Sequence, residues 1–406
     1  MAQGKSGLSR RGFLKGTAAA AAFTIVPRHV LGGAGHVSPS DTFGAALIGC
    51  GGRGGGTFGD LKRKHKLEVK QLARCDVKYV GSADNKTKYT DFRRVLERKD
   101  IDIVAIGTPP HWHALISIAA MEAGKDVLCE KPMTRFVAEG RAVAEAEKRY
   151  GRVYQVGTYG MFARAGQTRK IMTSGLLRKT EAVYVRRGGF KVKEWAGQVD
   201  LKPQPVPSWL DWDMYCGPSP IKPFVRPRHG GTHRWYWDYE GGGLADMGQH
   251  HLSGPTRLFG LDTMHPVEIE ACAPPAHPEV TGMWAWSKLK YANGFTLVLE
   301  SGEWGEPSGL KSRTPKVEEL SEEDQKMLKE MPDPEPLIGF GEAVKTRQKA
   351  GGNAEFAHHT ACLLHLTNVA IRIGRPFKFD PATERAVGDE EANRLIDQPM
   401  RAPWHL

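Results

Sequence analysis

The chain has 406 residues, 40% of them hydrophobic and 25% charged, which is typical of a globular protein and long enough for two domains. Its formal net charge of +11 includes a basic run over residues 62–66, yet no aromatic interleaving or recognition motif accompanies that run. We interpret the run as a solvated helix face and expect no nucleic-acid partner. The six cysteines form no C-x-x-C pair and no metal-binding spacing, so we expect free thiols and no metal site.

The N-terminus has the pattern of an export signal. Arg10 and Arg11 precede Phe13-Leu14-Lys15 and a short, alanine-rich apolar stretch over residues 17–26. A twin arginine before a modest apolar stretch is typical of the Tat pathway, and the stretch is too short to span a bilayer stably. We therefore expect residues 1–35 to be a Tat leader, the mature protein to be periplasmic, and no stable membrane span.

A glycine-rich loop follows the first apolar run. Residues 45–48 lead into G-x-G-x-x-G, and the pattern predicts a helix over 57–64. In a dinucleotide-binding turn, Gly49 allows the tight turn, Gly51 lets the backbone approach the pyrophosphate, and Gly54 lets helix and strand pack closely. The helix N-terminus then offers free N–H groups to the anion. The cofactor contacts predicted in this loop are Gly49, Gly51, Gly52, Arg53 and Gly54.

An acidic residue about twenty positions after such a loop holds the cofactor ribose. Asp76 lies 22 residues after Gly54, at the end of a second predicted strand. Its carboxylate would bind the ribose hydroxyls and repel a 2′-phosphate, so NAD is favoured over NADP, although Arg53 and Arg74 weaken that preference. The alternative interpretation is that Asp76 caps a turn.

Helices and buried strands then alternate as in a doubly wound parallel sheet. We predict helices over 90–99, 114–123 and 137–149, and strands over 101–107, 126–129 and 153–157. Residues 36–158 are therefore predicted to form a Rossmann domain that binds NAD(P). The loop after the strand at 101–107 adds candidate cofactor contacts at Thr108, Pro109, His111 and His113; the two histidines either bind the cofactor ribose or cap the next helix.

The second half of the chain has a different pattern of apolar and polar residues. Segments 181–186, 267–273, 284–291 and 295–301 alternate like strands of an open, mostly antiparallel sheet. An insertion rich in tryptophan and proline lies between 190 and 240, a charged surface excursion spans 305–336, and a helix is predicted over about 355–373. We therefore expect residues 159–406 to form an α+β domain for substrate binding and oligomerisation, with its tail packed back on the body.

Acid–base and electrostatic groups occur in two separate motifs. Lys131 follows a strand end within Glu130-Lys131-Pro132, and Asp246 and His250 stand four residues apart after three glycines. Residues four positions apart on a helix share a face. An aspartate beside an imidazole raises the basicity of the ring, which suits a general base. A lysine aimed at the same oxygen would stabilise a developing alkoxide. Asp246 also suits a helix cap. His251 points about 100° away and is interpreted as structural.

The glycine loop, the E-K-P tripeptide at 130–132 and the G-G-G-x-x-D-x-G-x-H block at 241–250 together resemble the glucose–fructose oxidoreductase / inositol dehydrogenase / MocA (Gfo/Idh/MocA) family. The resemblance covers nearly the whole chain from Thr42, and residues 384–404 resemble an exported, Tat-bearing subgroup. It implies that Glu130 and Lys131 contact the cofactor, that Pro132 is cis, and that His250 removes a hydroxyl proton while Asp246 orients it. The substrate contacts that we expect are Lys131, Arg234, Trp235, Asp246 and His250.

The resemblance also implies a function and an assembly. We expect an NAD(H)-dependent oxidoreductase that transfers hydride at a secondary alcohol of a sugar, glycoside or cyclic polyol, with a tightly held cofactor and a homodimeric or homotetrameric state. The alternative is a redox-neutral, NAD-dependent glycosidase or epimerase, which some relatives represent. A sugar-binding protein with a relict fold is disfavoured because Lys131, Asp246 and His250 are all present. Trp235, Tyr236 and Trp237 either stack on a sugar or fill the core.

Overall fold

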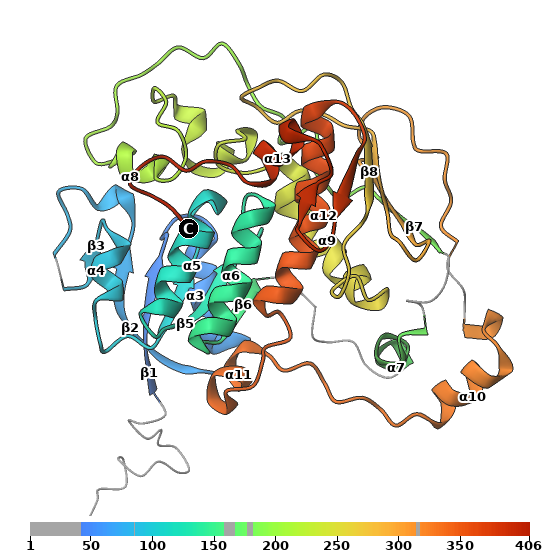
Figure 1. The fold of residues 1–406 in the computed structure, drawn as a ribbon. Helices are drawn as coiled ribbons and strands as arrows, with labels where there is room; N and C mark the ends of the chain where they lie inside the picture. Colours follow the sequence, from blue (N-terminus) through green and yellow to red (C-terminus); the bar gives the residue numbers. More distant parts are fainter. Residues whose placement is uncertain (1–41, 85, 158–166, 177–181, 314–316) are drawn as a thin grey trace, which may run out of the picture. The chain divides into compact units, whose positions relative to one another are not determined.

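Two six-stranded sheets organise the described part of the chain, which in this computed structural model comprises residues 42–84, 86–157, 167–176, 182–313 and 317–406 (Figure 1). The leader predicted at 1–35 lies outside the described residues. Residues 43–406 form one compact unit. Among the described residues, no helix is both long and apolar enough to cross a membrane.

The first sheet is the predicted Rossmann sheet. Its strand order is β3-β2-β1-β4-β5-β6, and its strands run parallel. The order reverses between β1 and β4, and ligands in such sheets bind outside the carboxyl ends at this point. The strands are β1 (Thr42–Ile48), β2 (Glu68–Cys75), β3 (Lys88–Tyr89), β4 (Ile103–Ile106), β5 (Asp126–Glu130) and β6 (Tyr154–Gly157).

Alternate residues of each central strand enter two different cores, which explains why these strands are apolar throughout. In β4, Ile103 and Ala105 pack in one core with Leu61 of α3 (Gly54–Arg63), whereas Val104 and Ile106 face the other. That second core includes residues of α4 (Phe92–Leu96), α5 (His113–Glu122) and α6 (Val137–Tyr150). Helix α4 is shorter than predicted: the Asp91 side chain caps its start at the Arg93 amide, and the helix ends at Leu96.

One helix that packs against the first sheet comes from the C-terminal part of the chain. Helix α11 (Phe340–Thr346) places Phe340 and Val344 in the same core as α3. The sequence patterns did not predict this helix, because seven residues are too few to show the apolar period of a helix.

The second sheet is mixed and mostly antiparallel, as predicted. Its order is β12-β11-β8-β9-β10-β7, and only β10 and β7 pair in parallel among the pairings of its described strands. The four predicted strands are present but shorter, and the β11–β12 pair was not predicted. The strands are β7 (Val183–Arg187), β8 (Glu268–Cys272), β9 (Trp286–Lys290), β10 (Thr296–Glu300), β11 (Phe377–Asp380) and β12 (Arg385–Ala386).

Helix α12 (Ala354–Ile373) connects the cores of both sheets. Its first turns contribute Phe356 and Ala361 to a core of the first sheet, and its later turns contribute Leu364 and Val369 to the core of the second. Figure 1 shows it beside α6. Among the described residues, the remaining α-helices are α7 (Gln167–Ser174), α8 (Trp212–Cys216), α9 (Gly242–Leu258), α10 (Glu322–Glu330) and α13 (Glu390–Ile396).

The C-terminal tail packs on the segment that leads into α5 and on α8. The ring of Trp404 lies 4.8 Å from that of Trp112, centroid to centroid, and Arg401 donates to Asp213 at 2.7 Å. All six cysteines are described and none forms a disulfide, which confirms the prediction of free thiols.

Candidate active site

A cavity of about 670 Å³ opens at the switch point of the first sheet. Three groups of residues line it: the glycine loop, the ends of β2, β4 and β5, and a wall formed by the insertion and α9. The predicted site residues that reach it are Gly49, Gly51, Gly52, Arg53, Asp76, Thr108, Pro109, Glu130, Lys131, Arg234, Asp246 and His250.

The glycine loop has the geometry that a dinucleotide requires. Gly49 has a φ of +83°, and a Cβ there would overlap the Thr108 backbone; a Cβ at Gly54 would overlap the carbonyl oxygen of Gly49. Around Gly51 and Gly52, by contrast, no atom of the described chain outside their immediate neighbours lies within 4 Å of a Cβ position. The turn is therefore tightly packed against the protein at Gly49 and Gly54 and open at Gly51 and Gly52. This arrangement fits a pyrophosphate held against backbone N–H groups.

Asp76 both caps a turn and lines the cavity. Its Oδ2 accepts a hydrogen bond from the Cys50 amide at 2.7 Å, and its Oδ1 accepts one from the Lys78 amide at 3.1 Å. The two interpretations of this residue thus coexist geometrically. Binding of ribose by its carboxylate stays a prediction.

Glu130 connects the glycine-loop helix to the end of β5. Its Oε1 accepts hydrogen bonds from Arg53 Nε at 3.0 Å and from the Thr57 hydroxyl. Arg53 also donates to Asp60 at 3.0 Å. This carboxylate therefore fixes the loop relative to Lys131, the next residue along the chain.

His111 and His113 are buried, and neither is among the described residues that line the cavity. His111 Nε2 lies 2.8 Å from the Tyr215 carbonyl oxygen, and the His113 ring spans the Pro132 and Thr108 carbonyls, each at 2.8 Å. Burial lowers the pKa of His113 to about 4 against the opposing effect of the two carbonyls, and the neutral ring donates to one of them. The two rings support the loop and the Lys131–Pro132 turn, whose peptide bond is cis, as expected.

Lys131 and Asp246 meet inside the cavity. Lys131 Nζ lies 2.7 Å from Asp246 Oδ1, and Arg234 Nε lies 3.1 Å from the same oxygen. Burial alone would raise the pKa of Asp246, but the two cations outweigh it and hold that pKa below its usual value. The site therefore contains an ionised carboxylate held by two cations.

Glycines and one glutamine hold α9 in place. A Cβ at Gly243 would overlap the Phe190 carbonyl oxygen, and one at Gly248 would overlap the Leu364 side chain on α12. Gln249 accepts a hydrogen bond from the Met133 amide at 2.8 Å and donates one to the Ala357 carbonyl at 3.1 Å. These close contacts seat α9 against the turn that carries Lys131.

His250 lies one turn after Asp246 and faces the cavity. Burial and the nearby Lys131 charge lower its pKa to about 4, against an opposing effect of Asp246. The imidazole is therefore neutral near pH 7 and able to accept a proton. The hydrogen bonds and ion pairs of Asp246 described above go to Lys131 and Arg234, and orientation of His250 by Asp246 stays a prediction. His251 instead contacts the Gly189 carbonyl at 2.9 Å, away from the site as predicted.

A second titratable pair in the cavity was not predicted from the sequence. His233 Nε2 lies 2.9 Å from Glu240 Oε2, and Arg234 Nε lies 3.9 Å from that oxygen. Burial, followed by repulsion from Asp246, raises the pKa of Glu240. In the sequence, the one signal that could have indicated Glu240 was its position immediately before the three glycines.

The aromatic residues of the insertion mainly fill a core. Tyr236 is buried in a cluster with Tyr215 and Tyr239, and Trp235 packs against that cluster. Trp237 is buried and donates to the His277 carbonyl at 3.0 Å. None of the residues from 235 to 237 is among those lining the cavity in the described chain.

A Rossmann sheet, an open glycine loop and a charged pocket walled by the insertion and α9 are typical of a dinucleotide-dependent oxidoreductase. Residues 43–158 match the family model described as "Oxidoreductase family, NAD-binding Rossmann fold", and residues 161–406 match the "Oxidoreductase family, C-terminal alpha/beta domain". The chain belongs to the Gfo/Idh/MocA family. Residues 7–27 match the Tat signal sequence, which indicates export.

Known relatives are similar over short segments. A levoglucosan dehydrogenase of Pseudarthrobacter phenanthrenivorans is 45% identical over 67 residues, 16% of this chain and 17% of the relative. A glycosyl hydrolase family 109 protein of Shewanella pealeana is 29% identical over 161 residues, 36% of this chain and 35% of the relative. The chain thus spans about a sixth to a third of the length of these relatives.

A solved structure shows the same fold. The WlbA dehydrogenase of Bordetella pertussis, in complex with NADH and UDP-GlcNAcA, superposes with a TM-score of 0.52 at 13% identity. The match covers 84% of this chain and 99% of that one.

Proposed function

We propose that this protein is an NAD(H)-dependent oxidoreductase that transfers hydride between its cofactor and a secondary alcohol of a sugar, glycoside or cyclic polyol. The observation that carries the proposal is the contact of Lys131 Nζ with Asp246 Oδ1 at 2.7 Å, in one cavity with the glycine loop and His250. The levoglucosan dehydrogenase relative supports the substrate class.

When bound, NAD supplies the hydride acceptor. The ammonium of Lys131 donates to the substrate oxygen and stabilises the alkoxide that forms as the hydroxyl proton leaves. That proton goes to the neutral ring of His250. Because a pKa of about 4 makes this ring a weak base, the transfer depends on Lys131 to stabilise the substrate alkoxide. Asp246 and Arg234 position Lys131, and both also face the substrate space.

The cavity wall near β2 supports NAD as the cofactor. A carboxylate at Asp76 repels a 2′-phosphate, and the glycine loop leaves space for the pyrophosphate. We further propose that the mature protein works in the periplasm with a cofactor loaded before export, because the Tat pathway carries folded proteins. A nucleotide pool is absent there, so the cofactor would be regenerated within the site.

A second candidate function is redox-neutral cleavage or epimerisation of a glycoside. Such chemistry needs another base, because a proton next to the transient ketone must be removed after oxidation. The His233–Glu240 pair offers one in the same cavity, and a family 109 glycosyl hydrolase is among the relatives. Lys131 favours the first function, since the family resemblance implies that hydrolytic members usually lack the lysine of the E-K-P motif.

The decisive experiment starts from protein purified without added nucleotide. Denaturation should release close to one equivalent of NAD or NADH, and a panel of sugars, glycosides and polyols should change the redox state of the bound cofactor. Protein that neither contains nor binds NAD would contradict the proposal. Cleavage of a glycoside without net change of the cofactor would select the second function. A homodimer or homotetramer, formed through the second sheet, stays a prediction that light scattering in solution can test.

A further inference from the structure

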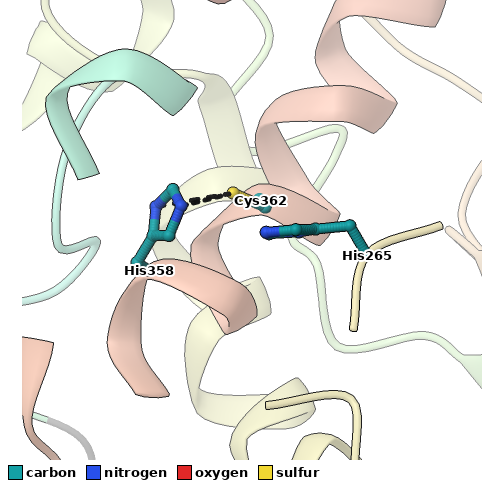
Figure 2. A group of neighbouring side chains, drawn as sticks. All are labelled: His265, His358 and Cys362. Carbon is teal, nitrogen blue, oxygen red and sulfur yellow. Dashed lines mark hydrogen bonds between the residues drawn. The ribbon is translucent and has the colours of Figure 1, made fainter. Parts of the chain in front are cut away.

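A buried cluster of metal-ligand type lies outside the catalytic cavity. His265 comes from the segment before β8, and His358 and Cys362 stand one turn apart on α12. Figure 2 shows the His265 ring pointing from its loop toward the other two side chains. One donor atom from each residue lies within 4.8 Å of the others, and all three residues are buried.

A carboxylate lies beside the two histidines of this group. Glu384, in the turn between β11 and β12, places Oε1 2.9 Å from His265 Nε2 and 2.8 Å from His358 Nε2. The sulfur of Cys362 lies 3.5 Å from His358 Nδ1. Two imidazole nitrogens and one thiol form the group of three, and the Glu384 carboxylate, which contacts both imidazoles, would supply the fourth ligand that a tetrahedral site requires.

The surrounding charges suit a divalent cation. Arg141 contacts Glu384 at 2.7 Å and Glu355 at 3.0 Å, so one cation faces two carboxylates in this cluster. Together, Arg141, Glu384 and Glu355 carry a net charge of −1. A divalent cation that displaces the thiol proton of Cys362 adds two positive charges and one negative charge, and the buried assembly becomes neutral.

We propose that His265, His358, Cys362 and Glu384 form a structural site for a divalent transition-metal ion of the zinc type. Mixed nitrogen, sulfur and oxygen donors favour such an ion over magnesium or calcium, which take oxygen ligands. None of the four residues is among those that line the catalytic cavity in the described chain. The ion would therefore join α12, the segment before β8 and the β11–β12 turn, and it would stabilise the fold rather than take part in hydride transfer.

The same side chains also form a hydrogen-bond network without an ion. Glu384 Oε1 accepts from both histidines and from Arg141, and the Cys362 thiol lies near His358. This network is the competing description of the cluster. It predicts no change in stability on adding a metal.

The test uses the full chain after chelator treatment and removal of the chelator. One equivalent of Co²⁺ should produce the thiolate-to-cobalt absorption of a tetrahedral site, and Zn²⁺ should raise Tm and release about one proton per ion. Cys362→Ser should abolish the absorption. Cys75→Ser is the matched control, since Cys75 is also a buried thiol but lines the catalytic cavity; this variant should retain the absorption.

Two results would overturn the proposal: wild-type protein that shows neither the absorption nor a Tm shift, or an absorption that persists in Cys362→Ser. If Cys362→Ser does not fold, X-ray absorption of the cobalt-loaded wild-type protein decides the question. One sulfur at about 2.3 Å together with three nitrogen or oxygen ligands supports the site. A shell of oxygen and nitrogen alone refutes it and leaves the hydrogen-bond network.

Discussion

Lys131 Nζ and Asp246 Oδ1 lie 2.7 Å apart, although 115 residues separate them in the chain. Lys131 follows the last residue of β5 and Asp246 lies in the second turn of α9, so the contact joins the two sheets' parts of the molecule at the cavity. A buried ion pair of this kind is a weak source of stability but a precise means of aiming a charge. We therefore expect its effects on activity to exceed its effects on folding.

Replacing Lys131 by alanine should reduce hydride transfer by about 10²–10³-fold in kcat, because it removes the donor that stabilises the developing alkoxide. Asp246 keeps Arg234 as a partner, so the variant should remain folded. Single-turnover formation of NADH measures the first effect and thermal unfolding the second. Lys62→Ala, at an exposed lysine of α3, is the control; full activity in Lys131→Ala would refute the assigned role.

The pH profile should have its acid limb near pH 4 to 5. The pKa of His250 is lowered to about 4, so the base form is present above that pH and is lost as pH falls through it. Because Asp246 raises that pKa, Asp246→Asn should move the limb to lower pH, beside any loss of rate. A limb at the ordinary histidine pKa of 6.5 in wild-type kcat/KM would show that another group is the base.

Stability should decline between pH 6.5 and 4. Burial lowers the pKa values of His65 and His113 to about 4, so in this range the unfolded chain binds protons that the folded chain does not. Each such group contributes up to about 1.4 kcal/mol per pH unit. His65→Gln should reduce the slope of the unfolding free energy against pH by roughly that amount, as urea titrations at several pH values would show. An unchanged slope would contradict the depressed pKa.

Glu240→Gln separates the two candidate functions. Simple hydride transfer does not use the His233–Glu240 pair, so this variant should keep NADH formation within about tenfold of the wild type. A redox-neutral glycosidase would lose cleavage by far more, since the proton next to the ketone could not be removed. Parallel assays of cofactor reduction and of glycoside cleavage distinguish these outcomes. Glu279→Gln, at a half-exposed carboxylate paired with Lys222, serves as the control.

Gly243→Ala should destabilise the protein by about 1–3 kcal/mol, because the added Cβ would overlap the Phe190 carbonyl oxygen, a backbone atom that cannot rotate away. Gly59→Ala is the contrast. It lies inside α3, and its added Cβ would meet only the Arg63 side chain at ordinary distance, so it should be neutral or stabilise by about 0.5–1 kcal/mol. Chemical denaturation measures both. Equal effects of the two substitutions would show that the α9 glycines are not needed for close packing.

Local patterns were sufficient for much of the architecture. The apolar run at 45–48, the G-x-G-x-x-G loop and Asp76 specify strand, turn and strand end over short distances, and the structure contains β1, α3 and β2 there. The period of the segment at 355–373 likewise predicted α12 to within one residue. Such elements are readable because side-chain periodicity reports which face of a helix or strand is buried.

Contacts between distant segments required the tertiary structure. The sequence alone predicted Lys131, Asp246 and His250, but not that Arg234 and Lys131 share one oxygen of Asp246, nor that Glu240 pairs with His233 in the same cavity. It also placed Trp235 among the expected substrate contacts and left open whether His111 binds cofactor, and neither is among the residues that line the cavity in the described chain. Periodicity says that a residue is buried; it does not say which neighbour is there.

The cluster at His265, His358 and Cys362 shows the same limit most clearly. Only the i, i+4 spacing of His358 and Cys362 is visible in the sequence, and that spacing alone predicts no metal site. The packing of α12 against the segment before β8 and the β11–β12 turn brings in His265 and Glu384. The sequence by itself thus determined the class of fold, the family and the export signal, because these are written in short motifs. The tertiary structure decided which charges meet, because that depends on how helices and sheets pack.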